Sequence, residues 1–307
     1  MLTEFKSILD LIKAFPTEQD CINHLESIRW NGTVISPFNY ESKVYKCKNN
    51  KYKCKETGKY FNVKAGTIFE DTKIPLQKWF MALYIFSSHK KGISSHQLAK
   101  DIDVTQKTGW FMLHRLRYAF EHPAFKQIVG EMPIEIDETF IGGLEKNKHT
   151  KKKTKGVQGR SVETKTPVLG IKERGGNIVA MVVPDTSRIS IRPIIENIVK
   201  KGAIVCTDEW KAYNGLQVDY EHMRVNHGAK EYVNNMASTN GVENFWSHLK
   251  RGIDGIYHWV SVPHLQRYVT EFSLRYNTRK VSTNYRFNLI LSNLAGRLTY
   301  EQLISHE

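Results

Sequence analysis

Apolar residues recur at helical spacing in several stretches of the chain. Residues three and four positions apart lie on one face of an α-helix, so such a repeat predicts a helix that buries one side. We expect short helices within residues 1–30, helices over residues 75–120, and a helix from Ala237 to Ile253. The apolar stripes that predict them are Cys21, Leu25 and Ile28; Leu76, Phe80, Leu83 and Phe86; and Val242, Phe245, Leu249 and Ile253.

Alternating apolar and polar residues predict strands in the second half of the chain. Residues 133–143 place Ile134 and Ile136 on one face of a strand and Glu135 and Asp137 on the other. A hairpin, a helix, two more strands and the helix over 237–253 are expected to follow, so this half predicts an α/β domain. The segments concerned are 166–173 and 176–184 for the hairpin, Ile191–Lys201 for the helix, and 202–208 and 220–227 for the strands.

Residues 34–63 contain short β-segments separated by Asn, Gly and Lys, which predict a small ribbon. A zinc ribbon needs two C-x-x-C knuckles, because the metal takes the place of a core. Only one of the four knuckle positions keeps its cysteine; they hold Ser36, Asn39, Cys54 and Thr57. We therefore expect a ribbon without zinc, stabilised by its aromatic residues: Phe38, Tyr45, Tyr52, Tyr60 and Phe61.

Residues 94–117 have the proportions of a helix-turn-helix, with a helix to Asp101, a tight turn at Asp103 and a second helix capped by Thr105. In that motif the second helix enters the major groove of DNA with its first residues leading. A three-helix packing unit without DNA contact is the alternative. The residues expected at DNA are Gln106, Lys107 and Thr108 at base edges, and Arg115 and Arg117 at phosphates.

The charge of the chain indicates an anionic partner. Its 307 residues include 45 Lys and Arg against 31 Asp and Glu, a formal net charge of +14, and this basicity together with 34 aromatic residues (14 Tyr, 14 Phe and 6 Trp) favours nucleic acid. Residues 145–160 form a basic loop, in which Lys151, Lys152 and Lys153 are expected to contact a phosphate backbone unless the loop is merely solvated.

No run of apolar residues is long enough to span a membrane, and the amino terminus has no signal-peptide pattern. We therefore expect a cytoplasmic protein with no membrane partner. Four cysteines in a chain of this length do not form a disulfide framework.

Three carboxylates occupy comparable places: Asp137 in the first strand of the sheet, Asp208 at the end of a buried strand, and Glu243 on the following helix. A carboxylate at the end of a buried strand is unfavourable unless it binds a cation or another partner. Carboxylates hold the magnesium ions that assist phosphoryl transfer. Lys250 shares a helix face with Glu243, two turns further on, and would contact nearby DNA. An amphipathic helix with charges on its solvent face is the alternative.

Several segments together resemble the motifs of bacterial insertion-sequence transposases of the DDE type, and the chain is most similar to the insertion-sequence 1595 family. The similarity continues through Gly66–Phe69, Gly255–His258 and Arg275–Arg279, so it covers most of the chain. The segments that carry it are Asp137–Gly143 (DETFIGG), Thr207–Tyr213 (TDEWKAY), Val225–His227 (VNH) and Asn240–Gly252 (NGVENFWSHLKRG).

This resemblance implies an RNase H-like catalytic core, a mixed sheet flanked by helices, that depends on Mg²⁺ or Mn²⁺. It also implies double-stranded DNA partners, namely the terminal inverted repeats and a target, with strand cleavage and strand transfer by a homo-oligomer at the nucleoid. The family pattern makes Asp137, Asp208 and Glu243 metal ligands and Lys250 and Arg251 DNA contacts. Some relatives use Asn as the third ligand, which leaves Asn240 or Asn244 as alternatives to Glu243. Relatives often begin with an intact zinc ribbon, whereas this chain has Ser36, Asn39 and Thr57 where cysteines would stand, so zinc is not expected here.

The predicted organisation is a helical segment (1–33), a degenerate zinc-ribbon-like module (34–70), a helix-turn-helix region (71–122), a catalytic domain (133–280) with a basic insertion (144–160), and a C-terminal helical segment (281–307). Two other functions are compatible with this organisation. One is an inactive DNA-binding repressor derived from a transposase, and the other is a general nuclease of the same fold.

Overall fold

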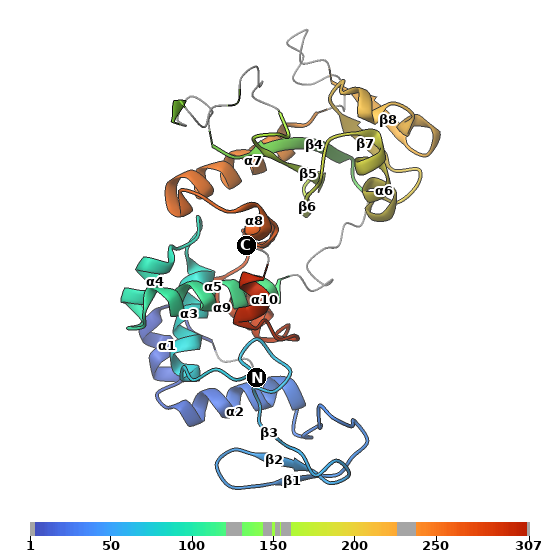
Figure 1. Cartoon of the computed structure of the whole chain (residues 1–307). Coiled ribbons are helices and arrows are strands. Elements are labelled where there is room, and N and C mark those ends of the chain that lie inside the picture. The colour runs from blue at the N-terminus through green and yellow to red at the C-terminus, as the bar shows by residue number, and fades with distance from the viewer. Residues whose placement is uncertain are drawn as a thin grey trace. The chain divides into compact units, whose positions relative to one another are not determined.

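The structure, a computed structural model, describes residues 4–120, 131–143, 149–150, 154, 161–225 and 238–305 (Figure 1). Its contacts divide the chain into two compact units, one formed by Met1–His122 with Lys280–Glu307 and the other by Pro123–Arg279. The predicted DNA contacts Lys151, Lys152 and Lys153 lie outside the described residues.

The first unit is organised around helix α3 (Leu76–Ser88), which buries the four apolar residues predicted for it. Ring contacts join α3 to the C-terminal part of the chain, because Phe80 lies 5.5 Å from Phe287 between ring centroids. Residues 280–305 therefore complete the core of the first unit. The helices that pack against α3 are α1 (Ile8–Ala14), α2 (Glu18–Trp30), α5 (Gln106–Ala119) and α9 (Thr283–Leu291). A short α10 (Tyr300–Ile304) follows α9.

Helices α4 (Ser95–Asp101) and α5 occur where the sequence predicts them. The side chains of Ser94 and Thr105 accept hydrogen bonds from backbone N–H groups in the first turns, which fixes both helix starts. Asp103 has φ 51°, the left-handed conformation of a tight turn, and α4 and α5 pack against each other.

The ribbon is a three-stranded antiparallel sheet of β1 (Val44–Lys46), β2 (Tyr52–Cys54) and β3 (Tyr60–Phe61). Tyr52 and Phe61 are buried and pack edge-on against Trp30 of α2, with centroid distances of 5.2 and 6.2 Å. The sequence interpretation needs correction for the other three aromatic residues. Phe38, Tyr45 and Tyr60 are exposed by 43%, 43% and 58%, so they do not form the core of the ribbon.

Hydroxyl groups surround the one cysteine that remains at a knuckle position. The Cys54 thiol lies 3.2 Å from the Ser42 hydroxyl, and both residues are buried. Hydrogen bonds, first from Ser36 and then from Ser42 and Thr57, lower the pKa of Cys54 to about 6. Ser36 and Thr57, which occupy two of the predicted knuckle positions, thus interact with the remaining cysteine.

The second unit is an α/β domain with a mixed five-stranded sheet in the order β6-β5-β4-β7-β8. The first three strands in sequence are antiparallel, as the predicted hairpin requires, and β7 and β8 run parallel to β4. The strands are β4 (Ile134–Ile141), β5 (Thr166–Glu173), β6 (Ile178–Val182), β7 (Ile204–Thr207) and β8 (Glu221–Arg224).

Helices flank both faces of this sheet. Ile134 and Ile136 of β4 belong to a buried cluster with Ile191 and Ile195 of α6 (Arg188–Ile198). On the other face, α7 (Asn240–Gly252) and α8 (Val262–Asn277) pack against β5 and β6. Because successive strand residues point to opposite faces, Glu135 and Asp137 are directed to the α7 side. After α7 the chain continues in a π-helical turn, Ile253–Tyr257.

Candidate active site

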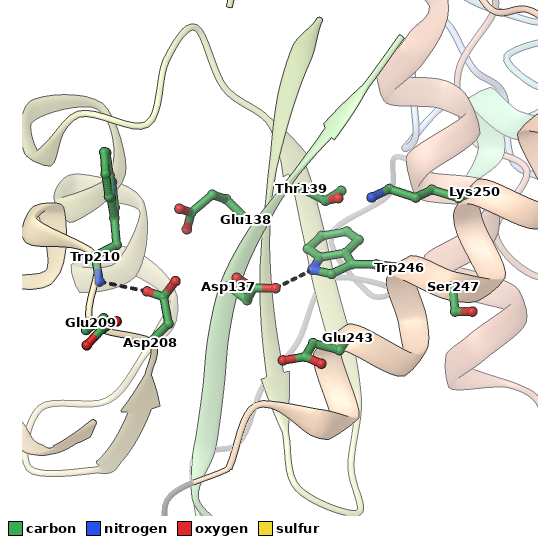
Figure 2. A pocket seen from close by; sticks show the side chains of 10 residues that line it. All are labelled: Asp137, Glu138, Thr139, Asp208, Glu209, Trp210, Glu243, Trp246, Ser247 and Lys250. Atoms are coloured by element: carbon green, nitrogen blue, oxygen red, sulfur yellow. Dashed lines mark hydrogen bonds between the residues drawn. The ribbon is translucent and has the colours of Figure 1, made fainter. Parts of the chain in front are cut away.

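The three predicted carboxylates line one pocket of about 730 Å³ in the second unit. Figure 2 shows Asp208 and Glu243 on opposite sides of Asp137, with Lys250 further along α7. The pocket is lined by Asp137, Glu138, Thr139, Asp208, Glu209, Trp210, Glu243, Trp246, Ser247 and Lys250. Neither Asn240 nor Asn244 is among the described residues that line it.

Strand register explains why Asp137 and Asp208 are neighbours. The parallel strands β4 and β7 pair Ile134 with Val205 and Glu135 with Cys206. The same offset relates Asp137 to Asp208, which is the first residue after β7. The two carboxylates therefore leave adjacent strands at the same level. Asp208 is further fixed because its Oδ1 accepts a hydrogen bond of 2.9 Å from the Trp210 backbone N–H.

Helix α7 supplies the third carboxylate and the lysine. Its buried residues Val242, Phe245 and Leu249 anchor it to the sheet, and this leaves Glu243 and Lys250 exposed on the pocket side. Glu243 Oε1 accepts a hydrogen bond of 2.9 Å from the Thr239 hydroxyl, one turn earlier. The predicted DNA contact Arg251 is exposed but is not among the described lining residues.

Trp246 connects α7 directly to Asp137. Its Nε1–H donates a hydrogen bond of 2.9 Å to Asp137 Oδ2 (Figure 2). The indole reaches Asp137 by lying over Gly170, the β5 residue paired with Asp137. A Cβ atom at Gly170 would come within 2.6 Å of the indole ring, so this close approach requires glycine.

The carboxylates influence one another electrostatically. The pKa of Asp137 is raised to about 6, chiefly by burial and to a smaller extent by the negative charges of Asp208 and Glu243. The hydrogen bond from Trp246 acts in the opposite direction. A group of carboxylates that disfavour one another's charge would be stabilised by a cation.

The chemistry of the donors fits a hard divalent cation, since all three are carboxylates. Their present spacing does not form a closed coordination site. Among the described residues, no three His, Cys, Asp or Glu side chains are arranged to hold a metal ion. Ligation of one ion would therefore need side-chain adjustment of Asp137, Asp208 or Glu243, each of which now accepts a hydrogen bond.

Glu135 fixes the first turn of α7 on the sheet. Its side chain is only 3% exposed, and its Oε2 accepts a 3.0 Å hydrogen bond from the Val242 backbone N–H. Its Oε1 pairs with Arg174 Nε at 3.3 Å. A carboxylate at this position satisfies an N–H group at the helix start and interacts favourably with the helix dipole. Gly241 permits the approach, since a Cβ there would lie 2.5 Å from Glu135 Oε2.

The residues predicted to read DNA divide into two groups. Gln106 and Lys107 are exposed at the start of α5, and Thr108 is half-buried there. Gln106 Nε2 donates to the Ser95 hydroxyl at 2.9 Å, and Lys107 Nζ lies 4.7 Å from the ring centre of Tyr300.

Arg115 and Arg117 are buried, with exposures of 5% and 1%. The Arg115 guanidinium donates to the backbone carbonyls of Leu298, Ile68 and Glu70 at 2.9–3.0 Å. This corrects the expectation of phosphate contacts, because a guanidinium enclosed by protein carbonyls is not presented to an external ligand. Arg115 instead ties the first unit together.

Sequence reasoning did not assign roles to Trp246 or Glu135. A signal for each was present, because Trp246 lies one helical turn beyond Glu243, and Glu135 shares a strand face with Asp137. Neither spacing reveals the hydrogen bonds of these residues, which span 109 and 107 positions in the sequence.

The mixed sheet of the second unit holds three carboxylates and a lysine in one pocket, and the comparisons with known proteins identify the class of the protein as a transposase. Residues 128–277 match the family model described as the ISXO2-like transposase domain. The chain belongs to this family, the insertion-sequence 1595 transposases.

Two relatives show how far the similarity extends. An uncharacterized protein in the transposable element ISH50 of Halobacterium salinarum is 30% identical over 277 residues, which cover 86% of this chain and 92% of the relative. An uncharacterized transposase-like protein of Haemophilus influenzae is 31% identical over 107 residues, 34% of this chain and 85% of the relative. No solved structure matches the chain. In the described part of the chain, no helix is long and apolar enough to cross a membrane.

Proposed function

We propose that this protein is an active DDE transposase, which binds the terminal inverted repeats of an insertion sequence and catalyses metal-dependent strand cleavage and strand transfer. The observation that carries the proposal is the pocket in which Asp137, Asp208 and Glu243 meet Lys250. Membership of the transposase family gives that pocket its chemical context.

The topology of the second unit supports an RNase H-like core. Three antiparallel strands, a helix and two further strands parallel to the first follow one another along the chain. In open sheets, ligands bind beyond the carboxyl ends of parallel strands, and Asp208 lies at the carboxyl end of β7. Asp137 lies beside it on β4, so the two aspartates occupy the part of the sheet where a substrate would be expected.

Asp137, Asp208 and Glu243 would hold Mg²⁺ or Mn²⁺ through carboxylate oxygens. The bound metal would supply an activated water or 3′-hydroxyl and stabilisation of the leaving oxygen. The chain itself orients the ligands. Trp246 holds one oxygen of Asp137, the Trp210 backbone holds one oxygen of Asp208, and Thr239 holds one oxygen of Glu243.

Lys250 lines the same pocket and provides a positive charge for the DNA backbone. It lies two helical turns from Glu243 on the same side of α7, so its ammonium group would contact a phosphate next to the one that is cleaved. Sequence-specific binding is proposed for the start of α5, where Gln106 and Lys107 are exposed.

An inactive repressor derived from a transposase is less well supported. Such a protein would need the DNA-binding surface but not the carboxylates. Here Glu135 and Trp246 both form specific hydrogen bonds that hold the α7 carboxylate and the β4 carboxylate in one pocket. A protein that only binds DNA does not need carboxylates held together in this way, whereas an enzyme that cleaves DNA does.

The decisive experiment is strand cleavage of a terminal-repeat duplex that includes flanking DNA, with Mg²⁺ as the added metal. Asp208→Asn should lower the cleavage rate by roughly 100-fold or more, because it removes a charge from the reacting centre, while repeat binding stays close to wild type. Glu209→Gln, which changes the neighbouring pocket residue, is the matched control and should retain most activity. Cleavage by Asp208→Asn at the wild-type rate would refute the assignment of the site.

Recognition is tested separately by binding. Lys107→Ala should weaken binding to the terminal repeat more than binding to random duplex. If the wild-type protein binds both duplexes equally, the start of α5 is not a recognition element.

A further inference from the structure

We infer that the exposed face of the N-terminal ribbon is a second DNA-binding surface, which contacts the phosphate backbone of duplex DNA independently of its sequence. The inference rests on the proposed function, since it assumes that the protein acts on DNA. It concerns a part of the chain outside both the candidate active site and helix α5.

The ribbon presents one row of side chains across its three strands. Tyr45 of β1 pairs with Lys53 of β2, and Lys53 pairs with Tyr60 of β3. Directly paired residues share one face of a sheet, on strands about 4.8 Å apart. The opposite face carries Tyr52 and Phe61, which are buried against α2. The row Tyr45–Lys53–Tyr60, which we call the ribbon face, is therefore the outer surface.

Lysine ammonium groups lie close to the exposed aromatic rings. Lys43 Nζ lies 5.6 Å from the ring centre of Tyr45, and Lys53 Nζ lies 5.5 Å from that of Tyr60. Elsewhere on the ribbon, Lys59 Nζ lies 5.3 Å from the ring centre of Phe38, which is also exposed. Cation–π contacts of this length hold a long side chain in a preferred position, which lowers the entropy lost when the charge meets a ligand.

The surroundings of the ribbon face are strongly basic. Residues 34–63 contain seven lysines against two glutamates, Glu41 and Glu56. Within the part of the chain that the structure describes, none of these seven lysines forms an ion pair with a carboxylate. Six of the seven are exposed, and Lys53 is half-exposed. The charge is therefore directed to an external anion.

Duplex backbone suits this surface better than unstacked bases. Single-stranded DNA is bound through bare aromatic faces on which bases stack. On the ribbon face an ammonium group lies over each tyrosine ring, so the surface offers positive charge and tyrosine hydroxyl donors. Those groups recognise phosphate oxygens and carry no sequence information. The ribbon face should therefore add affinity, whereas α5 adds discrimination.

The test uses the full-length protein and measures binding to a terminal-repeat duplex and to a random duplex across a series of salt concentrations. A triple variant, Lys43→Gln, Lys53→Gln and Lys59→Gln, should bind both duplexes roughly tenfold or more weakly. The slope of log Kd against the logarithm of the salt concentration should decrease by roughly 2 to 3, since each lost phosphate contact contributes about 0.9 to that slope. The preference for the repeat over random DNA should not change.

The matched control removes three exposed lysines elsewhere: Lys6→Gln, Lys13→Gln and Lys200→Gln. It produces the same change in net charge, so equal weakening by both triple variants would overturn the inference and leave only a general charge effect. Replacement of the three ribbon lysines by arginine should restore affinity and shows that a loss in the glutamine variant is not a folding defect. A ribbon variant that loses binding to single-stranded DNA alone would also overturn the inference.

The two proposals fail in different ways. If the wild-type protein does not bind duplex DNA at all, the proposed function fails. If the wild-type protein binds and cleaves the repeat duplex while the ribbon variant behaves like the control, only the ribbon inference fails.

Discussion

The Trp246 indole donates a hydrogen bond of 2.9 Å to Asp137 Oδ2 and so joins helix α7 to strand β4 inside the candidate active site. This bond ties the element that carries Glu243 to the element that carries Asp137. It also holds one of the two Asp137 oxygens, which restricts the rotation of the carboxylate. Trp246 is therefore a positioning residue for the proposed metal ligands.

Trp246→Phe should keep the aromatic packing over Gly170 but remove the donor to Asp137. We expect cleavage to fall by roughly tenfold or more and the Mg²⁺ concentration for half-maximal cleavage to rise, because a hydrogen bond to a charged group contributes about 1.5–3 kcal/mol. DNA affinity should be unchanged. The measurement is the cleavage rate as a function of Mg²⁺ concentration.

The control for this variant is Trp210→Phe, which changes the other indole of the pocket. Trp210 Nε1–H donates to the Thr186 backbone carbonyl rather than to a carboxylate. An equal Mg²⁺ shift in both variants would show that the Asp137 hydrogen bond has no specific role.

Gly170→Ala tests the close approach of Trp246 to the sheet. The added Cβ would lie 2.6 Å from the indole, so the ring must move away, and we expect a loss of about 1–3 kcal/mol in the free energy of unfolding. Urea denaturation measures this loss. Gly143→Ala is the control, because a Cβ at Gly143 meets no atom of the described residues within 4 Å. Similar stabilities of the two variants would mean that the ring has room to shift.

Much of the second unit could be predicted from local sequence patterns. Alternation in residues 133–143 correctly puts Ile134 and Ile136 on one strand face and Glu135 and Asp137 on the other, and in the structure the second face is directed to α7. The two hairpin strands and the amphipathic α7 were also predicted, because each pattern depends only on residues close in the sequence.

The residues that were misinterpreted depend on distant partners. The sequence predicts that Arg115 is exposed and contacts a phosphate. In the structure its guanidinium donates to the backbone carbonyl of Leu298, which is 183 positions away. The ribbon strands have only two or three residues each, so their sequence does not indicate which tyrosines face α2. Tyr45 and Tyr52 both lie in short strand segments, and Tyr52 is the buried one because it packs against Trp30 and Phe61.

Glu135→Ala should destabilise the second unit by about 1–3 kcal/mol, because it leaves the Val242 N–H at the start of α7 unsatisfied and removes the carboxylate that pairs with Arg174. Glu135→Gln keeps an acceptor for the Val242 N–H and should be less destabilising. Chemical denaturation measures both changes, and Glu221→Ala, at an exposed position of β8, controls for loss of a carboxylate. If the alanine and glutamine variants are equally stable, the N–H contact is unimportant.

His222 of β8 should make stability depend on pH. Its Nε2 lies 2.9 Å from the Thr207 hydroxyl, and burial, followed by the charge of Arg224, lowers the pKa of His222 from 6.5 to about 4. Between pH 6.5 and 4 the unfolded chain binds a proton that the folded chain does not. The free energy of unfolding should therefore fall as pH decreases through this window, by at most about 1.4 kcal/mol per pH unit from this group, with no further contribution below pH 4.

Because carboxylates also titrate at low pH, the informative quantity is the difference between wild type and His222→Gln. The variant should lose the part of the pH dependence that lies between pH 6.5 and 4, measured by urea denaturation at a series of pH values. His96→Gln, an exposed histidine of the first unit, controls for removal of an imidazole. Parallel pH profiles for wild type and His222→Gln would show that the folded protein accommodates the charged imidazole beside Thr207.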